Sequence, residues 1–173
     1  MGEGIVLEPA TRGSLLDDTV RTARFEAAAP QILSAIEGET DPIVIQTTLA
    51  ALLWQVFVQA SWVGFYRRTG PLRLSVGPYQ GPMGCLHIPF DRGVCGAAAR
   101  EKKTQLVPDV HAFPGHIACD DGARSELVVP VVDVHGEVHA VLDLDSRLPE
   151  AFSLDEAHLL ERFLVDAFSA AAW

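Results

Sequence analysis

The sequence predicts an α+β domain with a central antiparallel sheet flanked by helices. Two observations predict this class: segments with helical spacing stand at both ends of the chain, and hairpin-linked strands lie between them. The chain has 173 residues, of which 49% are hydrophobic, and this fits one domain with a full core. We therefore expect residues 1–18 to form an N-terminal lead-in and residues 19–173 to form a single domain.

Two helices are expected before the strands. Residues 19–38 have helical spacing, and Pro30 should kink or split that helix because proline has no N–H to donate. Residues 41–60 form the stronger helix candidate, with Asp41 as N-cap and Pro42 at the first helical position. Apolar residues cover nearly every face of this second helix, so we expect it to be largely buried.

The remaining elements are predicted from alternation and turn signals. Hairpin turns are indicated by "TGP" at 69–71 and by His135–Gly136. Ser153 and Glu156 have the spacing of a capping box at the start of the last helix. In chain order, the predicted elements are strands over 61–68 and 72–79, a short strand or extended segment over 85–90, a turn and alanine-rich helix over 93–102, a short strand over 104–110, strands over 126–134 and 137–146, and a helix over 153–173.

Charge and hydropathy narrow the function classes. The chain has 23 acidic and 13 basic residues, a net charge of −10, which argues against nucleic-acid binding through a broad basic face. No apolar run approaches the ~20 residues of a membrane span. The first residues lack a basic region leading into an apolar stretch, so no signal peptide is indicated. We expect a cytoplasmic protein with no nucleic-acid or membrane partner.

Three carboxylates are predicted to converge at one end of the sheet. Asp143 and Asp145 are two residues apart on a strand, so they face the same side. With the hairpin centred near Gly136, Glu126 on the preceding strand falls close to Asp145. Such a group of like charges raises the pKa of at least one carboxyl. For the aspartate pair alone, a solvated strand edge or an Asp-capped turn is the alternative.

The three cysteines stand in different contexts. Their odd number and the lack of a C-x-x-C pair argue against a secreted disulfide framework and against a local dithiol motif. Cys95 lies near a predicted helix N-terminus, where the helix dipole lowers a thiol pKa, although a small buried residue fits equally well. Cys85 follows the Gly/Pro-rich "YQGPMG". Cys119 lies in a loop, "HAFPGHIACDDGARSE", that also carries histidines and acids.

These residues support three chemistries to different degrees. A hydrolase with Cys119 as nucleophile and His116 as base lacks an oxyanion-hole motif, and the acids would oppose the developing negative charge. Sulfoxide reduction suits the set better, because a thiolate attacks sulfur, a protonated carboxyl protonates the departing oxygen, and a second thiol condenses with the sulfenic acid. A zinc site has suitable ligand types but spacings that match no compact zinc motif. Its candidate ligands are Cys85, His87, Cys95, His111, His116 and Cys119.

Five stretches within residues 61–146 resemble the free methionine-(R)-sulfoxide reductases, which are single GAF domains. These stretches are "SWVGFY", "GPYQGPMGCLHIPFDRGVCG", "PDVHAFPGHIACD", "SELVVP" and "VLDLDS". The resemblance implies a GAF fold with a six-stranded antiparallel sheet flanked by helices and a closed pocket. It further implies reduction of free L-methionine-(R)-sulfoxide, a homodimer, and thioredoxin as the reductant. No cofactor and no metal are expected.

The resemblance also assigns roles to the cysteines. Cys119 matches the family's nucleophile, and Cys85 matches the principal resolving cysteine. Cys95 matches a third cysteine with an auxiliary resolving role. The helix-dipole argument alone favours Cys95 as nucleophile, and we follow the family in assigning Cys119.

The acids and two aromatic residues complete the candidate site. By the resemblance, the acids bind and protonate the sulfoxide, and the aromatic side chains line the pocket, although ordinary core packing is an alternative for the aromatic pair. The matching residues are Glu126, Asp143, Asp145, Trp62 and Tyr66. The chain departs from the family pattern at Ala140, where glycine is usual, and at "DGAR" over 121–124, where a more neutral stretch is usual. A non-catalytic GAF module that binds a small ligand or senses redox state is the alternative function.

Overall fold

The order of elements is the one that the sequence predicts, with helices at both ends and strands between them. The computed structural model describes residues 5–117 and 122–173. Its elements are α1 (Asp18–Ala35), α2 (Pro42–Val56), β1 (Trp62–Gly70), β2 (Arg73–Gln80), β3 (His87–Pro89), α3 (Gly93–Glu101), β4 (Gln105–Val107), the short 3-10 helix η1 (Val110–Ala112), β5 (Ser125–Val132), β6 (Val138–Ser146) and α4 (Leu154–Ala167).

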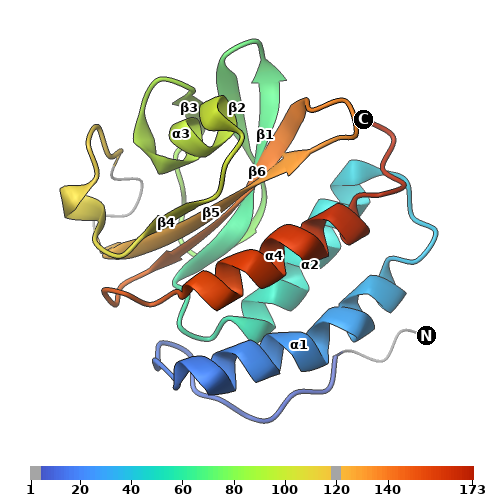
Figure 1. Ribbon diagram of the computed structural model, residues 1–173, viewed down its shortest axis with the longest axis vertical. Coiled ribbons are helices and arrows are strands. Elements are labelled where there is room, and N and C mark those ends of the chain that lie inside the picture. Colours follow the sequence, from blue (N-terminus) through green and yellow to red (C-terminus); the bar gives the residue numbers. More distant parts are fainter. Residues whose placement is uncertain (1–4, 118–121) are drawn as a thin grey trace.

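A six-stranded antiparallel sheet in the order β3-β2-β1-β6-β5-β4 forms the centre of the molecule (Figure 1). Each neighbouring pair of strands runs antiparallel, and β5 and β6 form the hairpin predicted around His135–Gly136. The fold class and the six-stranded sheet expected from the family resemblance are therefore confirmed.

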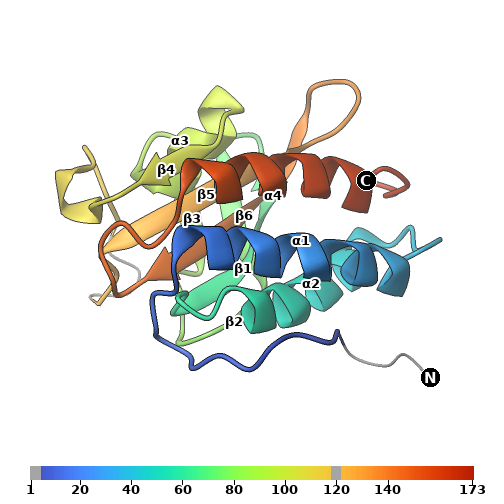
Figure 2. The ribbon, with the colours of Figure 1, turned by 60° about the horizontal axis from the view of Figure 1, so that its bottom comes forward.

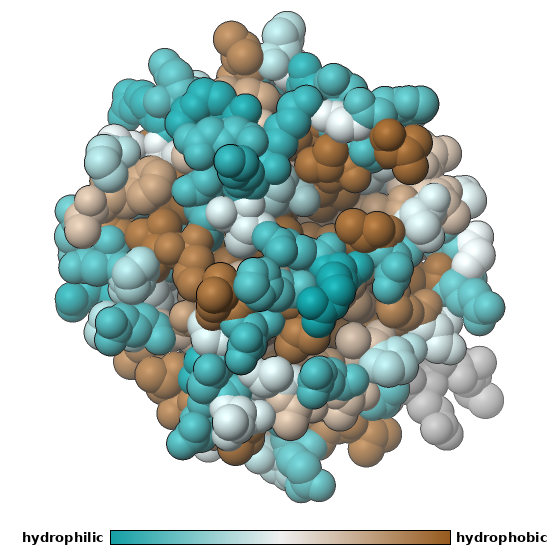
Figure 3. Space-filling view, viewed as in Figure 1, coloured by the Kyte–Doolittle hydropathy of each residue, from teal (hydrophilic) through white to brown (hydrophobic). Residues whose placement is uncertain are grey.

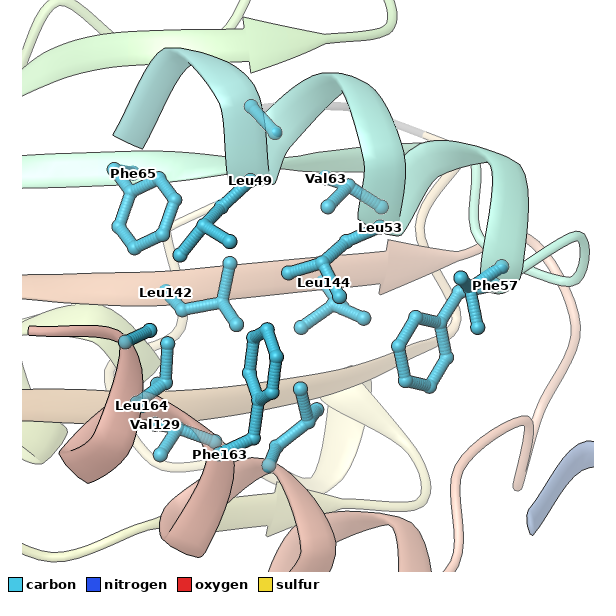
Figure 4. Close-up of a cluster of buried hydrophobic side chains, with 14 of the residues drawn as sticks. Leu49, Leu53, Phe57, Val63, Phe65, Val129, Leu142, Leu144, Phe163 and Leu164 are labelled. Atoms are coloured by element: carbon cyan, nitrogen blue, oxygen red, sulfur yellow. The ribbon is translucent and has the colours of Figure 1, made fainter. Parts of the chain in front are cut away.

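The two faces of the sheet bury different cores. Alternating residues of the central strands, such as Phe65, Leu142 and Val129, point to the face covered by α1, α2 and α4 (Figure 2). Figure 4 shows these side chains meeting Leu49 of α2 and Phe163 of α4. The other residues of the same strands face α3 and form a second, smaller core. It is this second face that carries the polar residues singled out in the sequence.

The predicted helix starts are confirmed in atomic detail. The side chain of Asp41 accepts a hydrogen bond from the Ile43 N–H at 2.8 Å and so caps α2. At α4, the Glu156 N–H donates to Ser153 Oγ at 3.2 Å and the Ser153 N–H donates to Glu156 Oε2 at 2.9 Å. Both halves of the capping box are thus present.

Several predicted element boundaries are wrong. The first helix is not split at Pro30, because α1 continues from Asp18 to Ala35 and is anchored in the core by buried residues on both sides of the proline, among them Phe25 and Ile32. The second and last helices end earlier than predicted, at Val56 and Ala167. After α4 the chain turns so that the Trp173 ring stacks on His139 and Phe168. The predicted domain start at residue 19 stays a prediction.

A buried ion pair ties the helical layer together. Arg21 Nε of α1 donates to Glu156 Oε1 of α4 at 3.1 Å, and Gln59 Nε2, just before β1, donates to the same oxygen at 2.9 Å. The Glu156 side chain is fully buried, so its charge depends on these partners. Removing one partner of such a pair costs roughly 3–5 kcal/mol, because the other charge is left buried without compensation.

None of the described helices combines the length and the apolar character required to cross a bilayer. On the face drawn in Figure 3, hydrophobic residues are scattered among hydrophilic ones. The candidate functional residues lie on the face of the sheet that α3 covers.

Candidate active site

Three carboxylates meet at one end of the sheet, on the face covered by α3. Glu126 of β5 lies directly opposite Asp145 of β6, and Asp145 lies opposite Trp62 of β1. Asp143 lies on the same face two residues earlier. Only 6% of Glu126 and 4% of Asp143 is exposed. The hairpin register thus brings the acids together as the sequence predicts, and it buries two of them, which excludes a solvated strand edge.

A cavity of about 20 Å³ lies against these carboxylates, with room for about one water molecule. The sheet forms its floor, and α3, His116, Ile117 and Ala123 cover it. The described lining residues are Ile88, Gly93, Val94, Cys95, His116, Ile117, Ala123, Glu126, Asp143 and Asp145. The cavity therefore lies against a cluster of acids and one thiol.

A glycine at the start of α3 allows this close covering. Gly93 has a φ of 71°, which favours glycine, and its N–H donates to the Gly115 carbonyl at 3.0 Å. A Cβ at Gly93 would lie 3.3 Å from Ile117 Cδ1. The N-terminus of α3 thus packs directly on residues 115–117 and holds them over the acids.

Cys95 sits in α3 with its thiol against the acids. It is 2% exposed, its thiol is free, and its Sγ donates to Glu126 Oε1 at 3.9 Å. Burial raises the pKa of this thiol well above its usual value, and the charges of Asp143, Glu126 and Asp145 raise it further. Of the two alternatives that the sequence left open for Cys95, its burial and its raised pKa fit the small buried residue. A protonated thiol is a poor nucleophile.

The buried carboxyls also favour their protonated forms. Burial raises the pKa of Glu126 well above its usual value, and the charges of Asp143 and Asp145 add to that effect. Burial raises the pKa of Asp143 to about 7, although hydrogen bonds from Cys95 and Glu126 partly offset it. Because the groups share one site, they titrate together, and the cluster retains a proton at neutral pH. Asp143 Oδ1 is buried without a hydrogen-bond partner.

Three aromatic rings form a wall beside the acids. The Trp62 ring stacks on Tyr66 with centroids 5.5 Å apart and on Tyr79 with centroids 5.0 Å apart. Trp62 and Tyr66 are about 13 Å apart along an extended strand, so their rings lean together over Gly64. A Cβ at Gly64 would lie 2.3 Å from Tyr79 Cβ, so this glycine also allows β2 to approach. Sequence reasoning did not single out Tyr79.

The segment that precedes Cys85 lies along this wall. Trp62 Nε1 donates to the Pro82 carbonyl at 3.1 Å. A Cβ at Gly84 would lie 2.9 Å from the Tyr66 hydroxyl, so the backbone passes directly over the ring. Cys85 itself is half-buried and disulfide-bonded. Cys119, the predicted nucleophile, belongs to residues 118–121, which lie outside the described part of the chain.

His116 joins the site, although sequence reasoning named it only as a base or a zinc ligand. Its Nε2 lies 3.8 Å from Glu126 Oε2, and burial lowers its pKa, with a smaller contribution from His111. The other histidines of the six-residue zinc set considered from the sequence do not gather there. His87 is exposed and its Nδ1 lies 2.9 Å from Ser75 Oγ, and His111 is exposed. The described members of that six-residue set therefore do not form a metal site.

A larger groove of about 850 Å³ lies elsewhere, between the β5–β6 turn and the C-terminal part of α4. Its lining includes Val131, Val165 and Phe168, and it shares no residue with the acid cluster and includes no cysteine. By volume alone, this groove would be the better candidate for a ligand-binding site. Chemistry favours the small cavity, because buried carboxyls with raised pKa values gather there.

Comparison with known proteins assigns the family. A family model described as the GAF domain matches residues 39–170. The free methionine-R-sulfoxide reductase of Saccharomyces cerevisiae is 37% identical over 147 residues, covering 79% of this chain and 82% of the yeast protein. This chain belongs to the free methionine-R-sulfoxide reductase family of GAF domains. The Escherichia coli protein of the same name is 38% identical over 127 residues, covering 73% of this chain and 76% of that protein.

A solved structure of this reductase family has the same fold. The free methionine-R-sulfoxide reductase of Neisseria meningitidis, determined in complex with its substrate, matches with a TM-score of 0.82 and 38% identity. The match covers 93% of this chain and 94% of that chain. The chain is therefore an oxidoreductase-family GAF domain, and the resemblance stated from its motifs is confirmed.

Replacing Asp143 with asparagine should stabilise the folded chain at high pH. Because burial raises the pKa of Asp143 from 3.8 to about 7, the folded state holds a proton that the unfolded chain releases. Stability contributed by the protonated form is complete below the unfolded pKa and is lost as the pH rises through the folded pKa. We expect Asp143→Asn to raise the free energy of unfolding at pH 8 by up to about 4 kcal/mol, the linkage value of this shift.

Urea unfolding of the two proteins at pH 8 and at pH 3 measures this gain. Near pH 3 both states of the wild type are protonated, so the difference between the proteins should shrink. The matched control is Asp155→Asn, which changes an exposed aspartate in the first turn of α4. An Asp143→Asn protein that is less stable than wild type at pH 8 would contradict the assignment of a destabilising buried charge.

Proposed function

We propose that this protein reduces free L-methionine-(R)-sulfoxide to methionine. The observation that carries the proposal is the small cavity that Glu126, Asp143 and Asp145 line beside an aromatic wall. The names of the yeast and E. coli relatives support the substrate, as does the Neisseria structure determined with its substrate. A sensing module has no need of a buried acid cluster that retains a proton, so the non-catalytic alternative gains no support from the site.

The acids supply the proton that sulfoxide reduction needs. The sulfoxide oxygen leaves only if it is protonated, and a carboxyl that stays neutral at pH 7 is a suitable donor. Burial raises the pKa of Glu126 and of Asp143, so either carboxyl can hold this proton. Asp145 is half-buried and lies directly opposite Glu126. When Asp145 is ionised, its negative charge favours the protonated form of Glu126. The reaction should slow as the pH rises above the cluster's pKa and the proton is lost.

The cysteines carry the electrons. The Cys119 thiolate attacks the sulfoxide sulfur while a carboxyl protonates the sulfoxide oxygen. The hydroxyl group then passes to the Cys119 sulfur as the S–O bond and the new S–S bond break, and the products are methionine and Cys119 sulfenic acid. The Cys85 thiol then attacks the sulfenic sulfur, a disulfide forms, and water leaves. Thioredoxin reduces that disulfide by thiol–disulfide exchange and becomes oxidised itself. The raised pKa of the Cys95 thiol supports the assignment of nucleophilic attack to another cysteine.

Recognition of the free amino acid follows from the charges available. The carboxylates of the cluster take the substrate ammonium group, and backbone N–H groups of the segment over 113–117 take its carboxylate. Trp62 and Tyr66 pack against the methyl and methylene groups. A cavity of about 20 Å³ does not admit methionine sulfoxide, so substrate entry requires the residues that close it to move. Methionine inside a peptide lacks both charged termini and should be excluded.

A coupled assay tests this function directly. Thioredoxin, thioredoxin reductase and NADPH are supplied, and NADPH oxidation is followed with three substrates. We expect turnover with free methionine-(R)-sulfoxide, and at least about 100-fold less with the S epimer or with a sulfoxide inside a peptide. Equal rates with the three substrates would contradict recognition of the free R epimer. No turnover by reduced protein, together with binding of the sulfoxide, would favour the sensing module.

Light scattering on the same preparation tests the expected homodimer, and fractionation of cells tests the expected cytoplasmic location.

Single-turnover experiments separate the roles of the cysteines. Reduced Cys119→Ser should form no methionine, because the attacking sulfur is gone. Cys85→Ser should form about one methionine per chain and then stop turning over with thioredoxin. The control is Cys95→Ser, which should keep the first turnover. Full methionine formation by Cys119→Ser would contradict the assignment of Cys119 as nucleophile. Loss of methionine formation in Cys95→Ser would indicate that Cys95 is the nucleophile instead.

Amide variants test the acid cluster. Glu126→Gln and Asp145→Asn keep shape and hydrogen-bonding capacity but remove the transferable proton. We expect each to slow the chemical step by at least about 100-fold, within the range of general acid catalysis. Methionine formation in a single turnover is measured from pH 5 to pH 9, with Asp155→Asn as the exposed control. Rates within a few-fold of wild type for both variants would show that these carboxylates are structural.

A further inference from the structure

Four metal-ligating side chains converge on the closed cavity. Ligand atoms of Cys95, Glu126 and Asp143 all lie within 4.8 Å of one another, and all three residues are buried. His116 stands beside them, with Nε2 3.8 Å from Glu126 Oε2. One thiol, two carboxylates and one imidazole thus surround the same small space. This set differs from the six-residue zinc set considered from the sequence, since Cys95 and His116 alone are common to both.

A second observation points to a ligand in this space. Asp143 is 4% exposed, lines the cavity, and has a carboxylate oxygen, Oδ1, that is buried without a hydrogen-bond partner. Hydrogen bonds from Cys95 and Glu126 reach this carboxyl group, but Oδ1 itself has no partner, and a buried acceptor without a partner is costly. A cation in the cavity would supply the missing interaction.

We propose that this cluster binds one thiophilic divalent cation of the zinc class through Cys95 Sγ, the carboxylates of Glu126 and Asp143, and His116 Nε2. Zinc takes sulfur at about 2.3 Å and nitrogen or oxygen at about 2.0–2.2 Å, so ligand atoms on one tetrahedral ion lie about 3.3–3.8 Å apart. The Cys95 Sγ–Glu126 Oε1 separation is 3.9 Å. The ligand atoms of Cys95, Glu126 and Asp143, which lie within 4.8 Å of one another, therefore need to approach by up to about 1.5 Å. His116 Nε2 lies outside this group and has to move toward it.

The donor types select the kind of ion. A thiolate and an imidazole favour zinc and its soft relatives, whereas magnesium and calcium require oxygen ligands. Binding replaces the thiol S–H bond with a sulfur–metal bond and releases that proton to solvent. The double positive charge then offsets the mutual repulsion of the carboxylates. The bound ion requires no change in oxidation state of any residue.

Occupation by a cation has a consequence that rests on the proposed function. The same carboxylates would protonate the sulfoxide, so the metal and the substrate exclude each other, and a thiophilic cation acts as a reversible inhibitor. Metal binding itself is independent of turnover. The experiment below therefore measures binding, and its failure is distinct from failure of the reductase assay.

Cobalt(II) is the probe, because its bond to a thiolate gives a charge-transfer absorption band. The titration uses the reduced full chain carrying Cys85→Ser and Cys119→Ser, so that Cys95 is its one remaining cysteine. We expect one equivalent of cobalt to bind with a sulfur-to-metal band and one equivalent of zinc to displace it. Adding Cys95→Ser should abolish the band. Adding Asp143→Asn or His116→Gln should weaken binding at least 10-fold.

A matched control distinguishes this site from surface binding. His87→Gln removes an exposed histidine outside the cavity and should leave the affinity unchanged. Circular dichroism of each variant verifies that it is folded, and the asparagine variant keeps the shape of the aspartate. Absence of the band at millimolar cobalt, or an affinity that does not change in Asp143→Asn, would overturn the proposal. Binding that is lost in His87→Gln instead would place the metal on the surface and would equally overturn it.

Discussion

The pairing of β5 with β6 is the constraint on which the rest of the site depends. Backbone hydrogen bonds in this hairpin set Glu126 directly opposite Asp145 and place Asp143 on the same face. Because a one-residue slip would move every side chain to the other face, the apolar residues between these acids fix the register as firmly as the backbone does. Leu127, Leu142 and Leu144 are fully buried under the helices. Burial of the hydrophobic residues on one face of these strands thus fixes the register that places the carboxylates together on the other face.

The helical layer supports this arrangement from behind. Glu156 holds Arg21 and Gln59 in a buried network, and the Gln59 carbonyl accepts a hydrogen bond from Ser146 Oγ at 2.7 Å. One residue before Ser146, the Asp145 carbonyl accepts the Ser61 N–H at 2.7 Å. The end of β6 that carries the acids is therefore fixed to the start of β1 and, through Gln59, to α1 and α4. The acids sit on one of the more firmly held parts of the fold.

Sequence reasoning predicted local features and the features that follow from strand periodicity. The caps of Asp41 and Ser153 depend on a few neighbouring residues, and the approach of Glu126 to Asp145 depends on counting from a turn. It failed where tertiary packing decides. Pro30 remains inside α1 because the flanking core contacts outweigh one lost hydrogen bond.

The contacts that distant segments make around the site could not be predicted from the sequence either. The helix dipole predicts a reactive Cys95, but the acids come from strands far along the chain, and burial against them reverses the direction of its pKa shift. Tyr79 joins Trp62 only because Gly64 lets β2 come close. His116 reaches Glu126 because the segment before it docks on Gly93. Each of these requires knowing which distant segments meet.

The buried state of Cys95 bears on how the protein withstands oxidative damage. Peroxides oxidise thiolates far faster than thiols, and they must reach the sulfur. A thiol that is 2% exposed and held protonated by its neighbours offers neither condition. A family that acts on an oxidised amino acid works where oxidants are present, and irreversible sulfinic and sulfonic acids are the hazard for any reactive cysteine there. Burial and its acidic neighbours thus keep the Cys95 sulfur reduced next to the acids under oxidising conditions.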